Sequence, residues 1–138
     1  MDLRIYTDGG SRGNPGPSAS AAVLKSLKDG SEGKTIATVS EFLGTTTNNQ
    51  AEYAAIILGL KKAAALGALR VEVFMDSELA SRQLNGEYRV KDADIAKRFL
   101  EVYRLRAHFK HVLFKHVRRH MNKEADALVN KVLDEHSR

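Results

Sequence analysis

The chain has 138 residues, enough for one domain with an apolar core of useful size. Its 43% apolar content argues against disorder, and its lack of cysteine excludes both a disulfide framework and a cysteine-ligated zinc site. Lys and Arg exceed Asp and Glu by 22 − 17 = 5, which favours a polyanionic partner such as nucleic acid, although a basic surface that serves solubility fits equally well. No apolar run approaches membrane length. We expect a single cytoplasmic domain over residues 1–138, monomeric and without membrane association.

Three strands are predicted first, and a long helix follows them. Residues 3–7 and 18–26 flank a glycine-rich loop, and residues 34–44 alternate weakly between apolar and polar side chains. A helix over residues 45–68 has polar residues at its start, a body rich in Ala, Leu and Ile, and Gly67 at its end. This body is apolar nearly all round, so the helix should be largely buried.

Strands and helices alternate in the second half of the chain. Residues 69–77 predict an apolar strand, 77–86 a short helix, 92–109 a longer helix, 110–117 a fifth strand and 122–136 a final helix. The resulting order, βββαβααβα, indicates an α/β fold with a five-stranded mixed sheet and helices on both faces.

The last two helices each have an apolar face at helical spacing. Such a face is typical of a helix that packs on a layered core. In the helix over 92–109 the face consists of Ala96, Phe99, Leu100, Tyr103 and Ala107, and in the final helix it consists of Ala125, Leu128, Val129, Val132, Leu133 and His136.

Four acidic residues occupy positions that these elements can bring to one rim. Asp8 ends the first strand and Asp76 ends the fourth, so parallel pairing would place both at the carboxyl edge of the sheet, where open α/β sheets form their sites. Glu52 lies in the first turn of the long helix and Asp126 in the first turn of the last. Each residue alone also has a local explanation in turn formation, capping or the helix dipole.

Bound cations explain the four carboxylates together. A structural role needs no crowding of like charges, whereas Mg²⁺ prefers oxygen ligands. Two such ions about 3.5–4 Å apart assist an in-line displacement at phosphorus. Together with the basic charge, the cluster predicts a metal-dependent nuclease that uses two Mg²⁺ ions, with Mn²⁺ as an alternative. The residues alone do not select its substrate.

Four stretches of the chain resemble type 1 ribonuclease H in order and spacing. They are YTDGGSRGNPGP, TTTNNQAEYAA, VFMDSELASRQLNG and RRHMNKEADALV, and together they span essentially the full length. The resemblance implies the ribonuclease H-like fold and hydrolysis of the RNA strand of an RNA/DNA hybrid by two-metal-ion catalysis, with 5′-phosphate and 3′-hydroxyl products. It assigns metal binding and catalysis to Asp8, Glu52, Asp76 and Asp126.

The resemblance also implies contacts with the hybrid from the glycine-rich loop and from the start of the long helix. Asn14 matches a residue that contacts the RNA strand. Thr47 and Asn48 match contacts to a DNA-strand phosphate and to the minor groove, although an Asn at this position can also cap the helix. The other substrate-binding residues that we expect are Gly9, Gln50 and Ser77.

His120 matches a catalytic histidine on a mobile loop, which assists product release or proton transfer in the family. An exposed histidine beside two arginines could also contribute charge alone. The chain departs from the family here, because "MN" replaces a longer glycine-containing loop and shortens the reach of His120. The tryptophan-bearing basic protrusion of the family is absent too. Other cations must then bind the hybrid, and the candidates are Arg82, Arg89, Lys91, Lys97, Arg98, Arg104 and Arg106.

Two other functions remain open at this point. A DNA-cutting member of the wider retroviral-integrase-like group would share the acidic rim, but it would lack TTNNQAEY and the RNA-contacting Asn14. A non-enzymatic module that binds hybrids would have no need of all four carboxylates, and it would bind equally well without metal.

Overall fold

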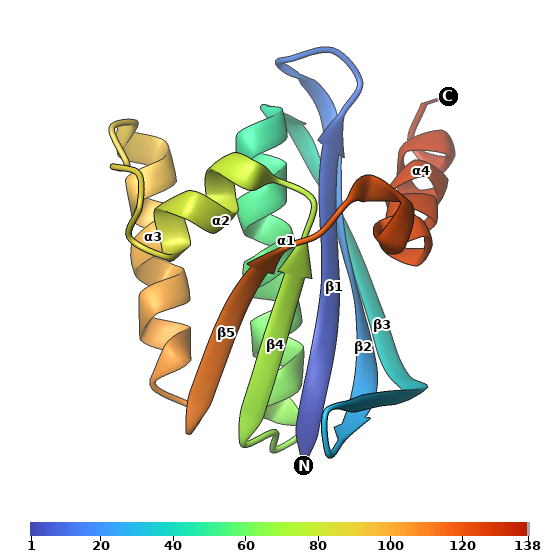
Figure 1. The fold of residues 1–138 in the computed structure, drawn as a ribbon. Coiled ribbons are helices and arrows are strands. Elements are labelled where there is room, and N and C mark those ends of the chain that lie inside the picture. The colour runs from blue at the N-terminus through green and yellow to red at the C-terminus, as the bar shows by residue number, and fades with distance from the viewer. Residues whose placement is uncertain (138) are drawn as a thin grey trace.

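Five strands form one mixed sheet in the computed structural model, which describes residues 1–137 (Figure 1). The strands are β1 (Asp2–Ser11), β2 (Gly16–Lys28), β3 (Ser31–Thr46), β4 (Arg70–Met75) and β5 (His111–His116). Their order across the sheet is β3-β2-β1-β4-β5. β1 pairs antiparallel with β2 and parallel with β4, and β4 pairs parallel with β5. The predicted fold class is therefore confirmed.

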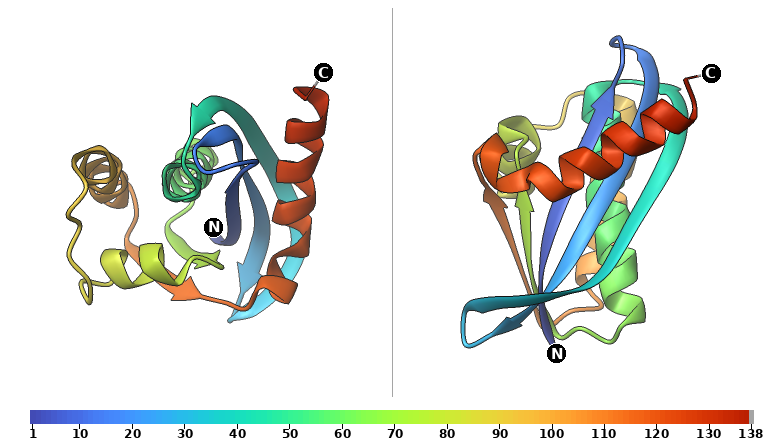
Figure 2. Two further views of the ribbon diagram at one scale, coloured as in Figure 1. Left: turned by 90° about the horizontal axis from the view of Figure 1, so that it is seen from above. Right: turned by 90° about the vertical axis from the view of Figure 1, so that its right-hand side faces the viewer.

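Helices cover both faces of this sheet, as predicted (Figure 2). They are α1 (Asn48–Ala65), α2 (Glu78–Leu84), α3 (Ala93–Arg106) and α4 (Lys123–Glu135). A short 3₁₀ turn, η1 (Arg119–Asn122), precedes α4 and was not predicted. No helix within residues 1–137 has both the length and the apolar character that crossing a membrane requires.

The alternation of side chains along β1 and β2 divides the core into two parts. Leu3, Ile5 and Leu24 pack with α1 on one face of the sheet. Ala19 and Ala21 point to the opposite face, where they contact α4. The predicted apolar face of α4 is confirmed, because Ala125, Val129 and Leu133 are buried, Leu128 and Val132 pack beside them, and His136 stacks on Phe42.

The apolar face predicted for α3 is only partly right, because Phe99 packs against the core but Leu100 and Tyr103 do not. Ile95 and Val102 are the buried residues of this helix, whereas Leu100 and Tyr103 are 52% and 53% exposed. The physical reason is that α3 packs on the core with a face that contains Ile95, Phe99 and Val102, at i, i+4 and i+7, and contacts α1 instead of lying flat on the sheet. An exposed apolar side of α3 therefore remains next to β5.

Two boundaries near the predicted site differ from the sequence prediction. β1 continues beyond Asp8 to Ser11 because it keeps pairing with β2, but its parallel pairing with β4 ends at Thr7 and Met75. Asp8 is therefore the first residue beyond the parallel ladder, not the end of the strand. α1 begins at Asn48 because the preceding threonines still pair in β3, so Glu52 is its fifth residue and lies beyond the first turn.

Candidate active site

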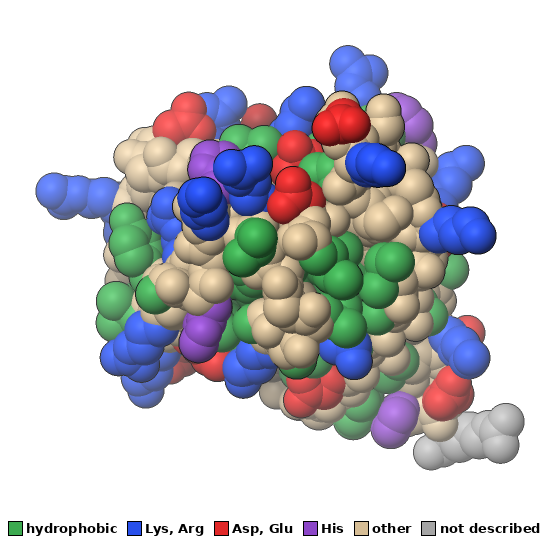
Figure 3. Space-filling model, turned by 90° about the horizontal axis from the view of Figure 1, so that it is seen from below, with side chains coloured by type: hydrophobic (Ala, Val, Ile, Leu, Met, Phe, Trp, Pro, Cys, Tyr) green, Lys and Arg blue, Asp and Glu red, His purple; other side chains and the backbone are tan. Residues whose placement is uncertain are grey.

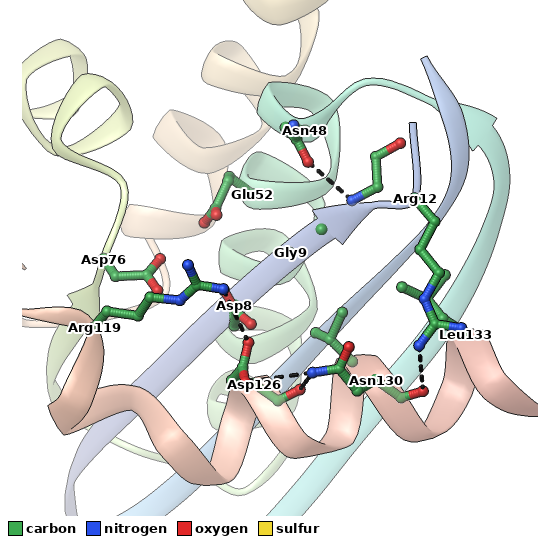
Figure 4. A pocket seen from close by; sticks show the side chains of 13 residues that line it. Asp8, Gly9, Arg12, Asn48, Glu52, Asp76, Arg119, Asp126, Asn130 and Leu133 are labelled. Carbon is green, nitrogen blue, oxygen red and sulfur yellow. Dashed lines mark hydrogen bonds and ion pairs between the residues drawn. The ribbon is translucent and has the colours of Figure 1, made fainter. Parts of the chain in front are cut away.

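Three carboxylates converge at the carboxyl ends of the parallel strands (Figure 4). Asp8 extends from β1 just past its last pair with β4, Asp76 directly follows β4, and Glu52 points across from α1. One carboxylate oxygen from each of the three lies within 4.8 Å of the others. The topology thus collects side chains that are 24 to 68 positions apart along the chain.

The fourth predicted carboxylate, Asp126, lies on the α4 side of the same pocket. The pocket has a volume of about 390 Å³, and Asp8, Glu52, Asp76 and Asp126 all line it. Asp126 is outside the tight group of three, and its Oδ2 accepts a hydrogen bond from Asn130 Nδ2 at 3.3 Å. The structure therefore brings the four predicted carboxylates together, three of them closely.

Burial and mutual repulsion disfavour ionisation of this cluster. Burial, followed by the charges of Asp76 and Asp126, raises the pKa of Asp8 to about 8. Burial, together with Asp8 and Asp76, raises the pKa of Glu52 well above its ordinary value. Burial also raises the pKa of Asp76, although Asn122 and Arg119 oppose that rise. Without a cation, the pocket therefore favours the neutral, protonated form of these carboxyl groups.

The donor set fits a hard divalent cation. It consists only of carboxylate oxygens, the ligands that Mg²⁺ and Mn²⁺ take. Glu52 Oε2 is buried and has no hydrogen-bond partner among the described residues. A buried carboxylate oxygen without a partner is costly, and a bound cation would satisfy it. Asp8, Glu52 and Asp76 are thus the residues that would hold the metal.

The raised pKa values predict how metal-free stability depends on pH. Asp8 binds a proton in the folded state up to a pH of about 8, whereas in the unfolded chain it releases the proton near 3.8. The folded state therefore holds more protons between these values, and the free energy of unfolding falls as pH rises through this window. Asp8→Asn should flatten the fall. Urea unfolding in chelator at pH 5 and pH 8 gives the free energy of unfolding of both proteins. An equal change in this free energy between the two pH values for both proteins would contradict the buried cluster.

Gly9 lines the pocket and permits the close approach of α1. A Cβ at this position would lie 2.1 Å from the carbonyl oxygen of Ala51. We expect Gly9→Ala to destabilise the fold by about 1–3 kcal/mol, since the backbone of α1 would have to move. Gly10→Ala is the matched control, because a Cβ there would meet only Val129 at an ordinary 3.5 Å. Equal midpoints of thermal unfolding for the two variants would contradict this contact.

The asparagines predicted to contact the hybrid are held by backbone hydrogen bonds. Asn48 Oδ1 accepts from the amide of Ser11 at 2.9 Å, and Asn14 Oδ1 accepts from the amide of Asn48 at 3.1 Å. Thr47, not an asparagine, caps α1, because its hydroxyl accepts from the amide of Gln50 at 3.2 Å. Since each Asn uses its oxygen in this way, its NH₂ group remains a donor for a ligand.

The remaining predicted contact residues have partners of their own. Ser77 is the N-cap of α2 and accepts from the amide of Ala80 at 3.2 Å. Gln50 Oε1 accepts a hydrogen bond from Arg98 Nε. Arg82 pairs with two glutamates of its own segment, 3.5 and 3.8 Å away, so its charge is already balanced.

His120 does not line the acidic pocket; the neighbouring Arg119 does. The guanidinium of Arg119 extends between Asp76 and Asp126, and its Nη2 lies 3.9 Å from Asp126 Oδ1 (Figure 4). His120 instead lines a separate depression with Tyr6. Sequence reasoning missed Arg119, because the turn η1 decides which residue of the Arg-Arg-His run faces the carboxylates.

Asn122 is a second residue that the sequence did not indicate. It is 1% exposed, and its Nδ2 donates to the carbonyl of Thr7 at 2.7 Å, just before Asp8. The same side chain opposes the rise in the pKa of Asp76, and it lies directly before α4, which carries Asp126. Asn122 therefore ties together the three elements that present these carboxylates. Its position before the last helix was the only available signal.

Comparison with known proteins agrees with this architecture. A family model described as "Reverse transcriptase-like" matches residues 6–132. Ribonuclease HI of Halobacterium salinarum is 40% identical over 133 residues, which cover 96% of this chain and 65% of the relative. A bifunctional protein of Mycobacterium tuberculosis is 37% identical over 97% of this chain. The chain spans only about a third (36%) of the length of that mycobacterial protein.

Solved structures extend the similarity to three dimensions. The crystal structure of RNase H1 from Halobacterium salinarum has a TM-score of 0.92 and 39% identity, and the match covers 98% of this chain and 99% of that one. The structure of LC11-RNase H1 in complex with an RNA/DNA hybrid has a TM-score of 0.91 and 38% identity, with 99% of both chains covered. In sequence and in fold, the chain belongs to the type 1 ribonuclease H family.

Proposed function

We propose that the chain is an endoribonuclease that hydrolyses the RNA strand of RNA/DNA hybrids with the help of two divalent metal ions. The observation that carries this proposal is the group of Asp8, Glu52 and Asp76, whose oxygens lie within 4.8 Å of one another beside a buried oxygen without a partner. The hybrid-bound structure of a 38% identical relative supports the choice of substrate. All of these residues come from one chain, which supports a monomeric catalytic domain.

The residues that line the pocket have different roles. Asp8, Glu52 and Asp76 would hold the metal, and Asp126 completes the acidic rim from α4. When bound, divalent ions supply activation of the attacking water and stabilisation of the leaving 3′-oxygen. Arg119 can donate hydrogen bonds to the phosphate that enters the pocket, because a guanidinium matches phosphate oxygens. The products then carry 5′-phosphate and 3′-hydroxyl ends.

Recognition of the hybrid rests on donors beside the pocket. The NH₂ groups of Asn14 and Asn48 remain available while their oxygens bind backbone amides. A hybrid displays 2′-hydroxyls and base edges in a shallow minor groove, where such donors can reach them. We propose that Thr47, Gly9, Gln50 and Ser77 also contact the two strands or shape their path.

Substitution at single 2′-hydroxyls tests this proposal. A hybrid with 2′-deoxy groups on both sides of one phosphate should resist cleavage there and be cut normally elsewhere, with Mg²⁺ or Mn²⁺ required throughout. End-labelling of the products should show 5′-phosphates. Equal cutting at the substituted phosphate, or undiminished cutting in chelator, would refute recognition of the RNA strand or metal catalysis, respectively.

A further inference from the structure

Basic side chains are also scattered over the end opposite the pocket (Figure 3), so charge alone marks no further site. The segment 104–123 differs, because it contains no Asp or Glu. Among the described residues, Arg119 is the one Lys or Arg of this segment with a carboxylate within 4.0 Å. The other cations of this segment have no carboxylate within 4.0 Å in the part of the chain that the structure describes, and they are Arg104, Arg106, Lys110, Lys115, Arg118 and Lys123.

A groove of about 280 Å³ lies beside this segment, between the end of α2, α3 and β5. Tyr103, Arg106 and Leu113 belong to its lining, which contains no acidic residue. Tyr103 and Leu113 are 53% and 40% exposed, so an aromatic ring and an aliphatic side chain face solvent there. The Arg106 guanidinium lies 5.1 Å from the centre of the Tyr103 ring and 5.7 Å from that of Phe114.

Nearby acidic residues do not neutralise this groove. Glu87 pairs with Arg82 at 3.8 Å, and Glu101 pairs with Lys61 of α1 at 3.2 Å. The groove is also held in shape, because Asn85 at the end of α2 donates to the carbonyl of Phe114 at 3.1 Å. The surface therefore combines a preformed apolar floor with a positive charge that no carboxylate balances.

This combination fits a single-stranded nucleic acid. An exposed aromatic ring can stack on an unpaired base, and neighbouring cations attract the phosphates. A duplex would not present its base faces in this way. β5 runs from the groove toward η1, and the five residue steps from Phe114 to Arg119 span at most roughly 17 Å at the rise of an extended chain. One strand could therefore occupy the acidic pocket and the groove together.

We propose that the groove between α3 and β5 binds a single-stranded nucleic-acid segment that adjoins the duplex held at the acidic pocket. The proposal rests on the proposed function for the duplex, while the groove itself is a separate surface. β5 is an edge strand, so an extended peptide could pair with it. The aromatic floor and the unpaired cations favour nucleic acid over a peptide.

Fluorescence anisotropy with the Asp76→Asn protein tests the proposal without cleavage. The probes are a blunt hybrid, four hybrids with a ten-nucleotide single-stranded extension at one of the four strand ends, and the free single strand. At least one extension should lower Kd about fivefold, the effect of one stacked base. In the Asp76→Asn protein, a second substitution, Tyr103→Ala, should remove this gain in affinity and leave the affinity for the blunt hybrid unchanged. Tyr103→Phe should keep the gain. Lys28→Gln, on the β2–β3 hairpin, is the charge control.

Each other outcome is informative. Equal Kd values for blunt and extended hybrids would overturn the proposal, and so would a gain that survives Tyr103→Ala in a protein with a normal unfolding midpoint. Tyr103-dependent binding of an acidic, aromatic peptide without any effect of the extensions would make the groove a protein-docking site instead. If the blunt hybrid fails to bind, the proposed function fails, but Tyr103-dependent binding of the free single strand would still support the groove.

Discussion

Asp76→Asn is expected to abolish hybrid cleavage while the chain stays folded. The substitution removes one of three carboxylates that lie within 4.8 Å of one another, and with it the charge that holds the metal. Since metal ions contribute several kcal/mol to such reactions and each 1.4 kcal/mol is a factor of ten, the rate should fall by at least about a thousandfold. Single-turnover cleavage of a labelled hybrid in Mg²⁺ measures this loss.

Stability distinguishes a catalytic role of Asp76 from a structural one. Burial raises the pKa of Asp76, so removal of its charge should leave the metal-free unfolding midpoint unchanged or raise it. Glu135→Gln, an exposed residue at the end of α4, is the matched control and should keep full activity. A large fall in the midpoint for Asp76→Asn would mean that the residue holds the fold together.

Arg119→Ala is expected to reduce turnover by about ten- to a hundredfold, the effect of one hydrogen bond to a charged group. Arg119 lines the acidic pocket, whereas His120 lines a neighbouring depression. His120→Ala should therefore change turnover less than threefold, well below the effect expected from the family resemblance alone. Steady-state and single-turnover rates of both variants measure the difference.

The two kinetic regimes separate the possible roles of Arg119. A loss in both rates assigns the guanidinium to phosphate positioning, and a loss in the steady state alone assigns it to product release. Arg119→Lys should restore part of the activity, because it keeps the charge but not the planar donor geometry. If His120→Ala proves more damaging than Arg119→Ala, the segment η1 turns the other way during the reaction.

The sequence predicts the fold well because each element has a local signal. Short apolar runs, the glycine-rich loop and the weak alternation of residues 34–44 mark strands, and capping residues and Gly67 bracket α1 within three residues at each end. The apolar face of α3 could not be predicted, since its burial depends on how α3 crosses α1. Leu100 and Tyr103 look like core residues in a helical projection but remain exposed, because tertiary packing decides which face is covered.

The candidate site was predictable to a smaller extent. Asp8 and Asp76 are identified by their places near the ends of adjacent parallel strands, and Glu52 by its motif. The positions of Arg119 and Asn122 at the site could not be predicted in this way, because the η1 turn that orients them has no strong local sequence signal. The orientation of one residue in an Arg-Arg-His run cannot be read from spacing when the connecting turn is unknown.

The most direct test of the central claim is one cleavage assay on labelled RNA/DNA, RNA/RNA and DNA/DNA duplexes of the same sequence, with Mg²⁺, with Mn²⁺ and with chelator. We predict cleavage of the RNA strand in the RNA/DNA hybrid, dependence on the divalent ion, and no cleavage of the DNA duplex. Cleavage of the DNA duplex at a comparable rate, or tight hybrid binding without any cleavage in either metal, would contradict the proposed function.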